Sequence, residues 1–599
     1  MAGFKKIAKL LVGAALAGAF VFSAAACTST TSNPDSGLVE EVDRNRTQLY
    51  VGNFNRGYGD EWILTLKERF EEFYKDKEFE PGTGKKGVQV MVDNLQDAGT
   101  TYINSMKNSR NAVIFNELVY YNDYVNQHLV APIDDVVKGD LSVYGDTGTI
   151  EDKMYDQHKK FYKSIDGHYY GIPHYTSFTG IIYDVDMFEN AGLYFAYDEE
   201  NSMDGFIIDK TDRRSAGPDG KLCEVCAANG YNYSAHNCDD GLPATYDEYF
   251  RLCDYIDAMG DMATIWTGSY RSEYLGYLLR SLAVDYEGMD QILLNYDFSG
   301  TATNLVDSID ADGTVHKRAA TPIQNSNGYE LYTSAGRYYA LDFLHRLIFN
   351  EEGKSSGYWY PNSFTGGMSQ LEAQDLYLTS VYENERIAML FDGIWWENEA
   401  KDTFRDMSVG DSSMSRENRR FGFMPFPKAE AKDVGVKKNT MMDTLYSMAF
   451  INANCMDDPV TYDLAKKFLM FAYTQESLEE FTMITSAPKS LKYEISSENQ
   501  KKMSYFGRSV WNNYKNSDVV YPISTNSLYL NNQSSFEYAS TFRTEVNDVV
   551  YTDIGSAMYN NGFTAKQMFE GIAAVNSKTN WENTYKDYFE KDAKTSVLS

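Results

Sequence analysis

The sequence lacks the short motifs that mark several common enzyme classes. It has no H-E-x-x-H and no Walker loop, and its seven histidines are single residues apart from one beside a cysteine group. A glycoside hydrolase needs only two carboxylates at a set separation, and nothing singles out one pair among the 86 acidic residues. A binding protein needs none of these motifs, so their absence favours binding over catalysis.

Basic residues are too few to balance the acidic ones. The 55 Lys and Arg against 86 Asp and Glu leave a formal net charge of -31. Proteins that bind nucleic acid supply a basic surface to the phosphates. We therefore expect no nucleic-acid partner.

Cysteine is also scarce, with six residues in the whole chain. Only Cys223, Cys226 and Cys238 are grouped, and with His236 they offer either a zinc site or a disulfide staple of a surface loop. They lie in an inserted segment, 204–240, where apolar periodicity vanishes and Gly, Asp, Asn and Cys dominate. No cofactor is required by this pattern, and a metal here would be structural.

The same inserted segment carries a second candidate metal site. Asp209, Asp212 and Asp219 surround a Gly-Pro-Asp-Gly turn, and hard cations such as calcium take several carboxylate and carbonyl oxygens on a tight turn. The spacing is not that of an EF-hand loop. A cluster of Asx turns without metal is the alternative.

A long uncharged apolar run occurs at the start of the chain, from Leu10 to Ala26, behind a basic head and directly before Cys27. The run is short for a membrane span, and a polar tether follows it. Small residues before a cysteine resemble the lipobox of bacterial lipoproteins. We expect a signal peptide over 1–27, a lipid on Cys27, a tether over 28–46 and a location outside the cytoplasm; an uncleaved anchor helix is the alternative.

Aromatic residues are abundant, with 47 Tyr, 33 Phe and 7 Trp making up 15% of the chain. Flat amphipathic rings cover the C–H faces of sugars while a hydroxyl or indole N–H takes a hydrogen bond. For any single tyrosine a place in the core is the simpler interpretation. Together they favour a polar, ring-shaped ligand.

Strands alternate with helices from Leu49 onward. Leu49 to Phe54, Val88 to Val92 and Ala112 to Phe115 are expected strands, and apolar residues at helical spacing follow from Glu61. This order predicts an α/β fold with parallel sheets covered on both faces. Ligands bind at the carboxyl ends of such strands, which nominates four residues: Arg56, Tyr58, Asn116 and Glu117.

Further candidates lie beside glycine turns later in the chain and in a segment that is expected to cross from one lobe of the protein to the other. An apolar run from Glu385 ends at Asp392-Gly393, and two tryptophans follow it. Adjacent indoles cannot both face one core comfortably, so one is free to serve as a platform. The additional candidate ligand-binding residues are Tyr175, Ser177, Trp266, Tyr270, Asp392, Trp395 and Trp396, whereas Met389 and Phe391 are expected in the core.

An ordered set of motifs resembles the extracellular solute-binding proteins of bacterial ABC importers, in the carbohydrate-binding family that includes maltose-binding proteins. The set spans most of Leu49 to Lys492: the lipobox, the Asn53 to Phe73 strand and helix, Asp166-Gly167 through Pro173, Tyr183-Asp184 with Phe188 to Gly192, Pro243 to Glu248, Ala388-Met389 with Gly393 to Trp396, Phe423 to Pro425, and a strand near Ser447. Glu385, where the family commonly has glycine, and the Cys223 to Cys238 insertion depart from it.

The resemblance implies a type II periplasmic-binding-protein fold, with two α/β lobes that close on a sugar like a hinge. The expected lobes are 47–178 with 436–490, and 179–435 with 491–599. It also implies a lipid-anchored monomer, palmitoylated on the outer face of the cell membrane, that delivers an oligosaccharide to ABC permease subunits. Trp395 or Trp396 resembles the family's stacking platform, and Trp266 and Tyr175 resemble its cleft aromatics.

Two alternatives remain open at this point: an extracellular glycoside hydrolase or lyase, and the same fold with a peptide, polyamine or acidic sugar as ligand. Because Arg56 is the one evident cation among the candidates, a neutral glycan is preferred over a uronate.

Overall fold

The first sheet begins with the strand expected after the tether. In the computed structural model, which describes residues 41–195, 206–207, 241–537 and 542–591, β1 (Thr47–Phe54) pairs in parallel with β2 (Val88–Leu95) and β3 (Val113–Asn116). β16 (Met448–Ile451) runs antiparallel to β3 and β4 (Ile172–Pro173), in the order β2-β1-β3-β16-β4. The predicted parallel pairing holds for β1, β2 and β3, whereas β16 enters from a distant segment and runs in the opposite direction.

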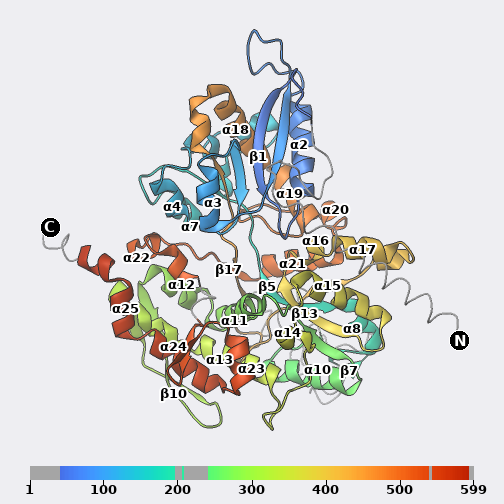
Figure 1. Cartoon of the computed structure of the whole chain (residues 1–599), viewed down its shortest axis with the longest axis vertical. Helices are drawn as coiled ribbons and strands as arrows, with labels where there is room; N and C mark the ends of the chain where they lie inside the picture. The colour runs from blue at the N-terminus through green and yellow to red at the C-terminus, as the bar shows by residue number, and fades with distance from the viewer. Residues whose placement is uncertain (1–40, 196–205, 208–240, 538–541, 592–599) are drawn as a thin grey trace. The chain divides into compact units, whose positions relative to one another are not determined.

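Helices cover this sheet with the faces that the sequence pattern indicates. α2 (Glu61–Phe73) buries Trp62, Ile63, Leu66 and Phe70, which recur at helical spacing. Figure 1 shows α2, α18 (Pro459–Ala472) and α19 (Gln475–Thr485) beside β1. Shorter helices complete this side: α3 (Gly99–Met106), α4 (Tyr121–Asn126), α5 (Asp134–Val137), η1 (Leu141–Tyr144), α6 (Ile150–Lys153), α7 (Asp156–Tyr162) and η8 (Ala453–Asp457).

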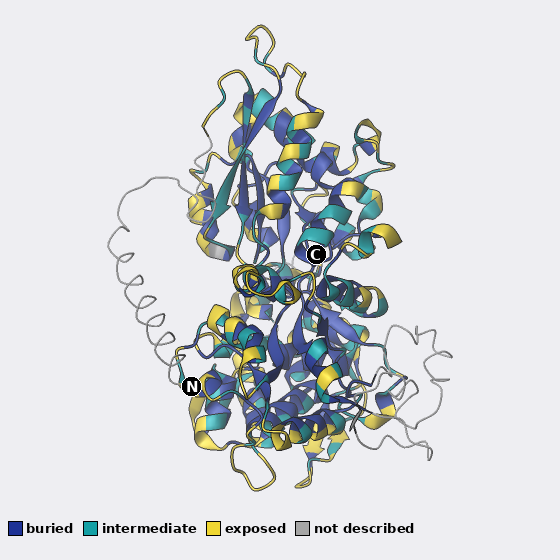
Figure 2. Cartoon of the chain, turned by 90° about the vertical axis from the view of Figure 1, so that its right-hand side faces the viewer, coloured by how far each residue is buried: buried dark blue, intermediate teal, exposed yellow. Residues whose placement is uncertain are grey.

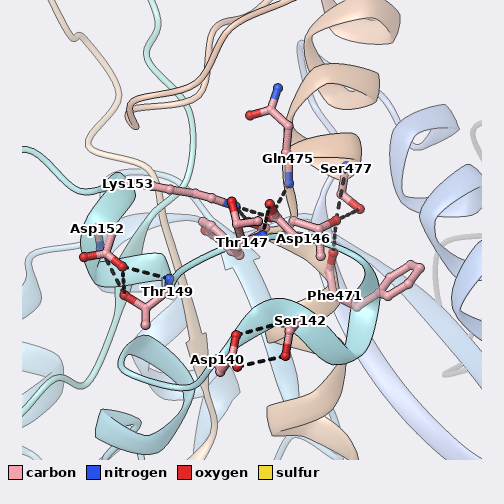
Figure 3. Close-up of polar contacts among 12 residues, drawn as sticks. Asp140, Ser142, Asp146, Thr147, Thr149, Asp152, Lys153, Phe471, Gln475 and Ser477 are labelled. Carbon is pink, nitrogen blue, oxygen red and sulfur yellow. Dashed lines mark hydrogen bonds and ion pairs between the residues drawn. The ribbon is translucent and has the colours of Figure 1, made fainter.

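Polar contacts connect the segment around Asp146 and Lys153 to the residues between the end of α18 and the start of α19 (Figure 3). The Asp146 carboxylate accepts from Lys153 Nζ and, at 2.7 Å, from the backbone N–H of Gln475 at the start of α19. Lys153 Nζ also donates to the carbonyl of Tyr473 at 2.8 Å. Burial opposes the charge, but these hydrogen bonds outweigh it and lower the pKa of Asp146.

The second sheet is buried along its central strands. β13 (Ile387–Gly393) is buried at every residue, runs parallel to β8 (Met262–Ile265) and antiparallel to β5 (Thr179–Asp184), and β14 (Phe421–Phe423) flanks β5. Met389 and Phe391 lie in this core, as expected. The helices around it are α8 (Val185–Ala191), α10 (Tyr246–Ala258), α11 (Arg271–Glu287), α14 (Asn362–Thr365), α15 (Gln370–Thr379), η5 (Ser380–Tyr382), α16 (Trp396–Glu399), α17 (Lys401–Ser408), η6 (Ser412–Met414), η7 (Ala431–Asp433), α20 (Ser497–Gln500) and α21 (Tyr505–Asn516).

Additional layers extend this side of the protein (Figure 1). α13 (Ala335–Ile348) packs between α11 and α24 (Ala565–Val575). The other elements are α12 (Met289–Asp297), η4 (Asn325–Thr333), α22 (Ser527–Leu530), η9 (Gln533–Phe536), α23 (Ile554–Asn561) and α25 (Lys578–Thr584), with strands β6 (Tyr194–Phe195), β7 (Phe206–Ile207), β9 (Gly300–Ala302), β10 (Val306–Ile309), β11 (Val315–Lys317), β12 (Thr321–Ile323), β18 (Thr544–Val546) and β19 (Val549–Tyr551).

Crossing segments join the two sheets and lie side by side. The chain passes from β4 to β5, returns from β14 to β16, and passes again from α19 to α21, with β15 (Thr440–Met442) and β17 (Asp518–Val520) paired on the way. The backbone N–H of Thr176 donates to the Pro488 carbonyl at 2.8 Å, and that of Thr444 to the Ser177 carbonyl at 2.9 Å. The α/β fold with two sheets, expected from the sequence, is confirmed.

Burial follows the two sheets, where Figure 2 shows the buried residues concentrated. The chain divides into the units Met1–Arg44 and Asn45–Ser599, and this description concerns the second. Among the described helices, none combines the length and apolar character needed to cross a membrane.

Candidate functional site

Residues from separate strand ends and from a crossing segment meet in one cluster. Tyr58, after β1, shares a hydrogen bond with Ser177 in the crossing segment, with 2.6 Å between Oη and Oγ. Its ring lies edge-on to that of Tyr175, with 4.6 Å between centroids. The Tyr175 hydroxyl donates to the carboxylate of Glu117, which follows β3. We call these residues, together with Asp443, the central cluster.

Glu117 is a buried carboxyl whose charge is unfavourable. Burial raises its pKa to about 8, against the opposing effect of the hydrogen bond from Tyr175, and the nearby charges of Asp443 and Glu399 raise it further. At neutral pH the group is mostly protonated. It can then both donate and accept hydrogen bonds, as a sugar hydroxyl does.

Asp443 is a member of the cluster that the sequence did not reveal. Its Oδ1 accepts from the backbone N–H of Ser177 at 2.9 Å, and the backbone N–H groups of Leu445 and Tyr446 also hydrogen-bond to it. Burial raises its pKa to about 6, although these N–H groups favour the charged form. The loop holding it lies between β15 and β16, where no motif marks it.

An indole from the second sheet forms the opposite wall. Trp395 follows β13 and precedes α16, and a Cβ built on Gly57, after β1, would lie 3.2 Å from the Trp395 Cβ. Its ring stands at 82° to that of Tyr277, with 6.3 Å between centroids. The indole N–H donates to the Tyr274 hydroxyl. Thus Trp395, Tyr274 and Tyr277, the indole wall, adjoin the residues after β1.

Asp392, close to Trp395 in the chain, shares one hydrogen-bond donor with the carboxyl group of Glu399. Gln374 Nε2 donates to Asp392 Oδ2 at 3.0 Å and to Glu399 Oε2 at 2.8 Å. Burial raises the pKa of Asp392, and it raises that of Glu399 to about 7. The side chain of Asp392 therefore supports the turn that carries Trp395.

The structure does not bring every predicted site residue to the cluster. Trp266 and Trp396 are fully buried in the core of the second sheet: Trp266 stacks on Phe391 with 5.6 Å between centroids, and Trp396 packs edge-on to Phe421. Neither indole therefore belongs to the indole wall, because each fills space between the sheet and its helices.

The remaining predicted ligand-binding residues take other places. Arg56 is exposed and donates to Gln96 at 3.5 Å, and Tyr270 is 49% exposed ahead of α11. Asn116 is buried, and its amide group hydrogen-bonds to the Asp97 carbonyl and the Glu117 N–H. The predicted lipid site Cys27 and the predicted metal ligands lie outside the described residues: Asp209, Asp212, Asp219, Cys223, Cys226, His236 and Cys238.

Helix α11 contributes residues that sequence reasoning did not assign to the site. Tyr274, Tyr277 and Arg280 follow each other at helical spacing, so one face of the helix presents all three. The spacing of the tyrosines was visible, but aromatic residues on a helix are more often core. Arg280 carries no sequence signal of its own.

A cavity adjoins the cluster on the side of the crossing segments. Its volume is about 30 Å³, and its lining includes Asp443, Tyr446, His158 and Gln533. A space of this size holds about two waters. Ligand pockets occupy roughly 300 to 1,000 Å³, so this cavity cannot take a sugar ring in the conformation described.

Solved structures of carbohydrate-binding proteins match across most of the chain. The apo form of RafE from Streptococcus pneumoniae has 12% identity and a TM-score of 0.49, covering 90% of this chain and 100% of that one. A chitin oligosaccharide binding protein has 16% identity and a TM-score of 0.49, covering 90% and 99%. Maltose-bound MalE3 of T. maritima has 13% identity and a TM-score of 0.48, covering 88% and 99%. No protein-family model matches the chain, and no curated protein matches it.

Proposed function

We propose that this chain is the substrate-binding lipoprotein of a carbohydrate ABC importer. It captures an oligosaccharide between its two sheets and delivers it to permease subunits without breaking a bond. One observation carries the proposal: residues after β1 and β3, a crossing segment and an indole after β13 form a single aromatic and hydrogen-bonding cluster.

The chemistry of the cluster suits a saccharide. Trp395 and Tyr277 offer flat rings to C–H faces, and Tyr58, Ser177 and Glu117 offer hydroxyl and carboxyl groups to ring hydroxyls. Because burial keeps Glu117 mostly neutral, its carboxyl can donate as well as accept. Such groups bind alternating donors and acceptors better than a fixed charge would.

Binding requires the cluster to open. Trp395 lies against Gly57 across the two sheets, and the adjoining cavity of about 30 Å³ is far smaller than a sugar. The crossing segments supply a hinge, since a few residues there can absorb the backbone changes of closure. Closure on the ligand would then present a distinct surface to a permease.

The anchor is part of the same proposal. A lipid on Cys27 would keep the protein at the outer face of the cell membrane, with 28–46 as its tether. Metabolic labelling with radioactive palmitate tests this: the expected label on the wild type disappears in Cys27→Ala. A wild type without label contradicts the anchor.

The test of the binding function is a thermal-shift screen of the mature chain against oligosaccharides. A ligand that binds only the folded form must raise the melting temperature, by an amount that grows with its concentration. We expect at least one oligosaccharide to do so. If none raises it at millimolar concentration, the proposed function is wrong.

A glycoside hydrolase is the second candidate, favoured by the raised pKa values of Glu117, Glu399 and Asp443. General acids of such enzymes are tuned in this direction. Against it, Asp443 accepts three backbone N–H groups and Glu399 shares Gln374 with Asp392. Chromatography of the ligand after long incubation decides: intact sugar supports binding, and shorter products support hydrolysis.

A further inference from the structure

Arg280 is a buried cation between the indole wall and the central cluster. It lies on α11, only 3% exposed, with its Cζ 5.0 Å from the centroid of the Tyr277 ring. The titratable groups near it include the phenols Tyr277 and Tyr446, which are neutral at pH 7, and the carboxyl of Asp443. The guanidinium is thus next to Tyr277 of the indole wall and within electrostatic range of Asp443 of the central cluster.

This guanidinium has no counterion among the described residues. Its Nε and Nη2 are buried without a hydrogen-bond partner, and none of the ion pairs in the described part of the chain includes it. Two other buried cations on this side are paired: Arg419 lies 2.8 Å from Asp184, and Lys428 lies 2.8 Å from Asp285. Within the described ranges the buried Lys489 has no carboxylate partner either, but its Nζ lies 2.7 Å from His174 Nδ1, whereas two of the three guanidinium nitrogens of Arg280 have no hydrogen-bond partner.

The nearby Asp443 does not fill this role. Its carboxylate accepts backbone N–H groups from Ser177, Leu445 and Tyr446, which hold it in the crossing segment. It attracts Arg280 at a distance but forms no contact with it within 4.0 Å. The hydrogen-bonding capacity of Asp443 is directed at the backbone.

An unpaired buried guanidinium is an unfavourable arrangement for a folded protein. Burial lowers the pKa of Arg280, yet arginine stays protonated in proteins, so the charge cannot be removed by losing a proton. Such a group is retained where an anion joins it in another state of the protein. The planar fork of its N–H donors matches a carboxylate with two parallel hydrogen bonds.

We propose that Arg280 binds the carboxylate of an acidic saccharide, so that the ligand contains a uronic acid. This inference rests on the proposed saccharide-binding function. A single carboxylate fits better than a phosphate ester, because one cation stands among the acidic side chains of Glu117, Asp443 and Glu399. It also reverses the preference for a neutral glycan that followed from Arg56, which is exposed.

The test compares each acidic oligosaccharide with its own methyl ester. Oligogalacturonides, oligoglucuronides and oligomannuronates are titrated into the mature chain by calorimetry, each as free acid and as ester. We expect one free acid to bind at least about 30-fold more tightly than its ester, because loss of one partner from a buried charged hydrogen bond has effects of this order. This comparison needs only the wild type.

Variants then assign the preference to Arg280. Arg280→Gln should bind the acid about as weakly as the ester, with ester binding changed less than about threefold, and Arg280→Lys should retain part of the preference. Arg405→Gln is the control, because Arg405 is an exposed surface residue paired with Asp402. Melting curves show whether each variant is folded.

Each outcome bears on the inference. Equal affinity for acid and ester, tighter binding of neutral saccharides, or a full preference in folded Arg280→Gln overturns it while the saccharide-binding function stands. If no saccharide of either kind binds, the proposed function fails and this inference fails with it.

Discussion

Trp395 lies against Gly57 so closely that a Cβ at position 57 would sit 3.2 Å from the Trp395 Cβ. Gly57 follows β1 of the first sheet, and Trp395 follows β13 of the second. The contact is therefore made between the two sheets, at the point where a ligand would have to enter.

Replacing Gly57 by alanine should weaken closure more than it weakens the fold. Gly57 and Gly59 both have a positive φ, +81° and +71°. A Cβ on Gly59 would meet nothing within 4 Å. Both alanine variants pay roughly 1 kcal/mol of backbone strain. Only Gly57→Ala also presses on Trp395, so it should lose saccharide affinity about tenfold more than Gly59→Ala in calorimetric titrations. Equal affinities for the two variants would contradict the role of this contact.

Alanine substitutions of the adjacent Trp395 and Trp396 should differ in their effects on saccharide affinity and on stability. Trp395→Ala should reduce saccharide affinity at least about tenfold, since it removes a stacking surface at the site, and because this indole is only 6% exposed it should also lower the unfolding free energy, by less than Trp396→Ala does. Trp396→Ala should lower the unfolding free energy by about 3–5 kcal/mol, because that indole is fully buried among core aromatics. Urea unfolding and titration of both variants give the comparison. Loss of affinity in neither variant would remove Trp395 from the site.

Glu117 should make the protein less stable as pH rises toward 8. Its pKa is about 8 when folded, against 4.5 for the solvent-exposed group of the unfolded chain, so its contribution to stability is complete below about pH 4.5 and is lost as pH rises through 8. Between these two pH values, Glu117 lowers the unfolding free energy by at most about 1.4 kcal/mol per pH unit. Glu117→Gln stays neutral and should flatten the fall in melting temperature between pH 5 and 8.

Other groups contribute to the same slope, so the flattening should be partial. Glu399, with a pKa of about 7, and Asp443, with one of about 6, act in the same direction. The exposed Glu582→Gln serves as the control and should leave the slope unchanged. A slope identical in wild type and Glu117→Gln would show that Glu117 is not buried as described.

The ion pair of Figure 3 should matter for stability and leave binding unchanged. Asp146 and Lys153 are each 11% exposed, and Asp146→Asn leaves the lysine without its counterion. We expect a loss of about 3 kcal/mol in unfolding free energy. The matched pair Asp463 and Lys467 is 51% and 31% exposed, so Asp463→Asn should cost at most about 0.5 kcal/mol. Similar losses in the two variants would contradict the difference in burial.

Much of the secondary structure followed from the sequence because local patterns are strong there. The strand and helix from Leu49 to Phe73 were predicted nearly as observed, since apolar periodicity is a local signal. The direction of β16 was not, because strand pairing depends on how the crossing segments return the chain.

Part of the cluster was predicted from strand ends and from the expected crossover. Tyr58 and Glu117 were nominated as strand-end residues, Tyr175 and Ser177 as crossover residues, and these four do lie together. Asp443 and Arg280 could not be found, since one lies in a crossing loop and the other in the middle of a helix. Trp396 was nominated by its place after a glycine turn and by the family resemblance, and Trp266 by the resemblance, and neither signal distinguishes a platform from a core indole.

The most direct test of the account is a calorimetric titration of oligosaccharides into the mature chain, followed by analysis of the sugar. The account predicts saturable binding at one site per chain with the sugar recovered intact. The absence of binding by any oligosaccharide, or recovery of cleaved products, would contradict it.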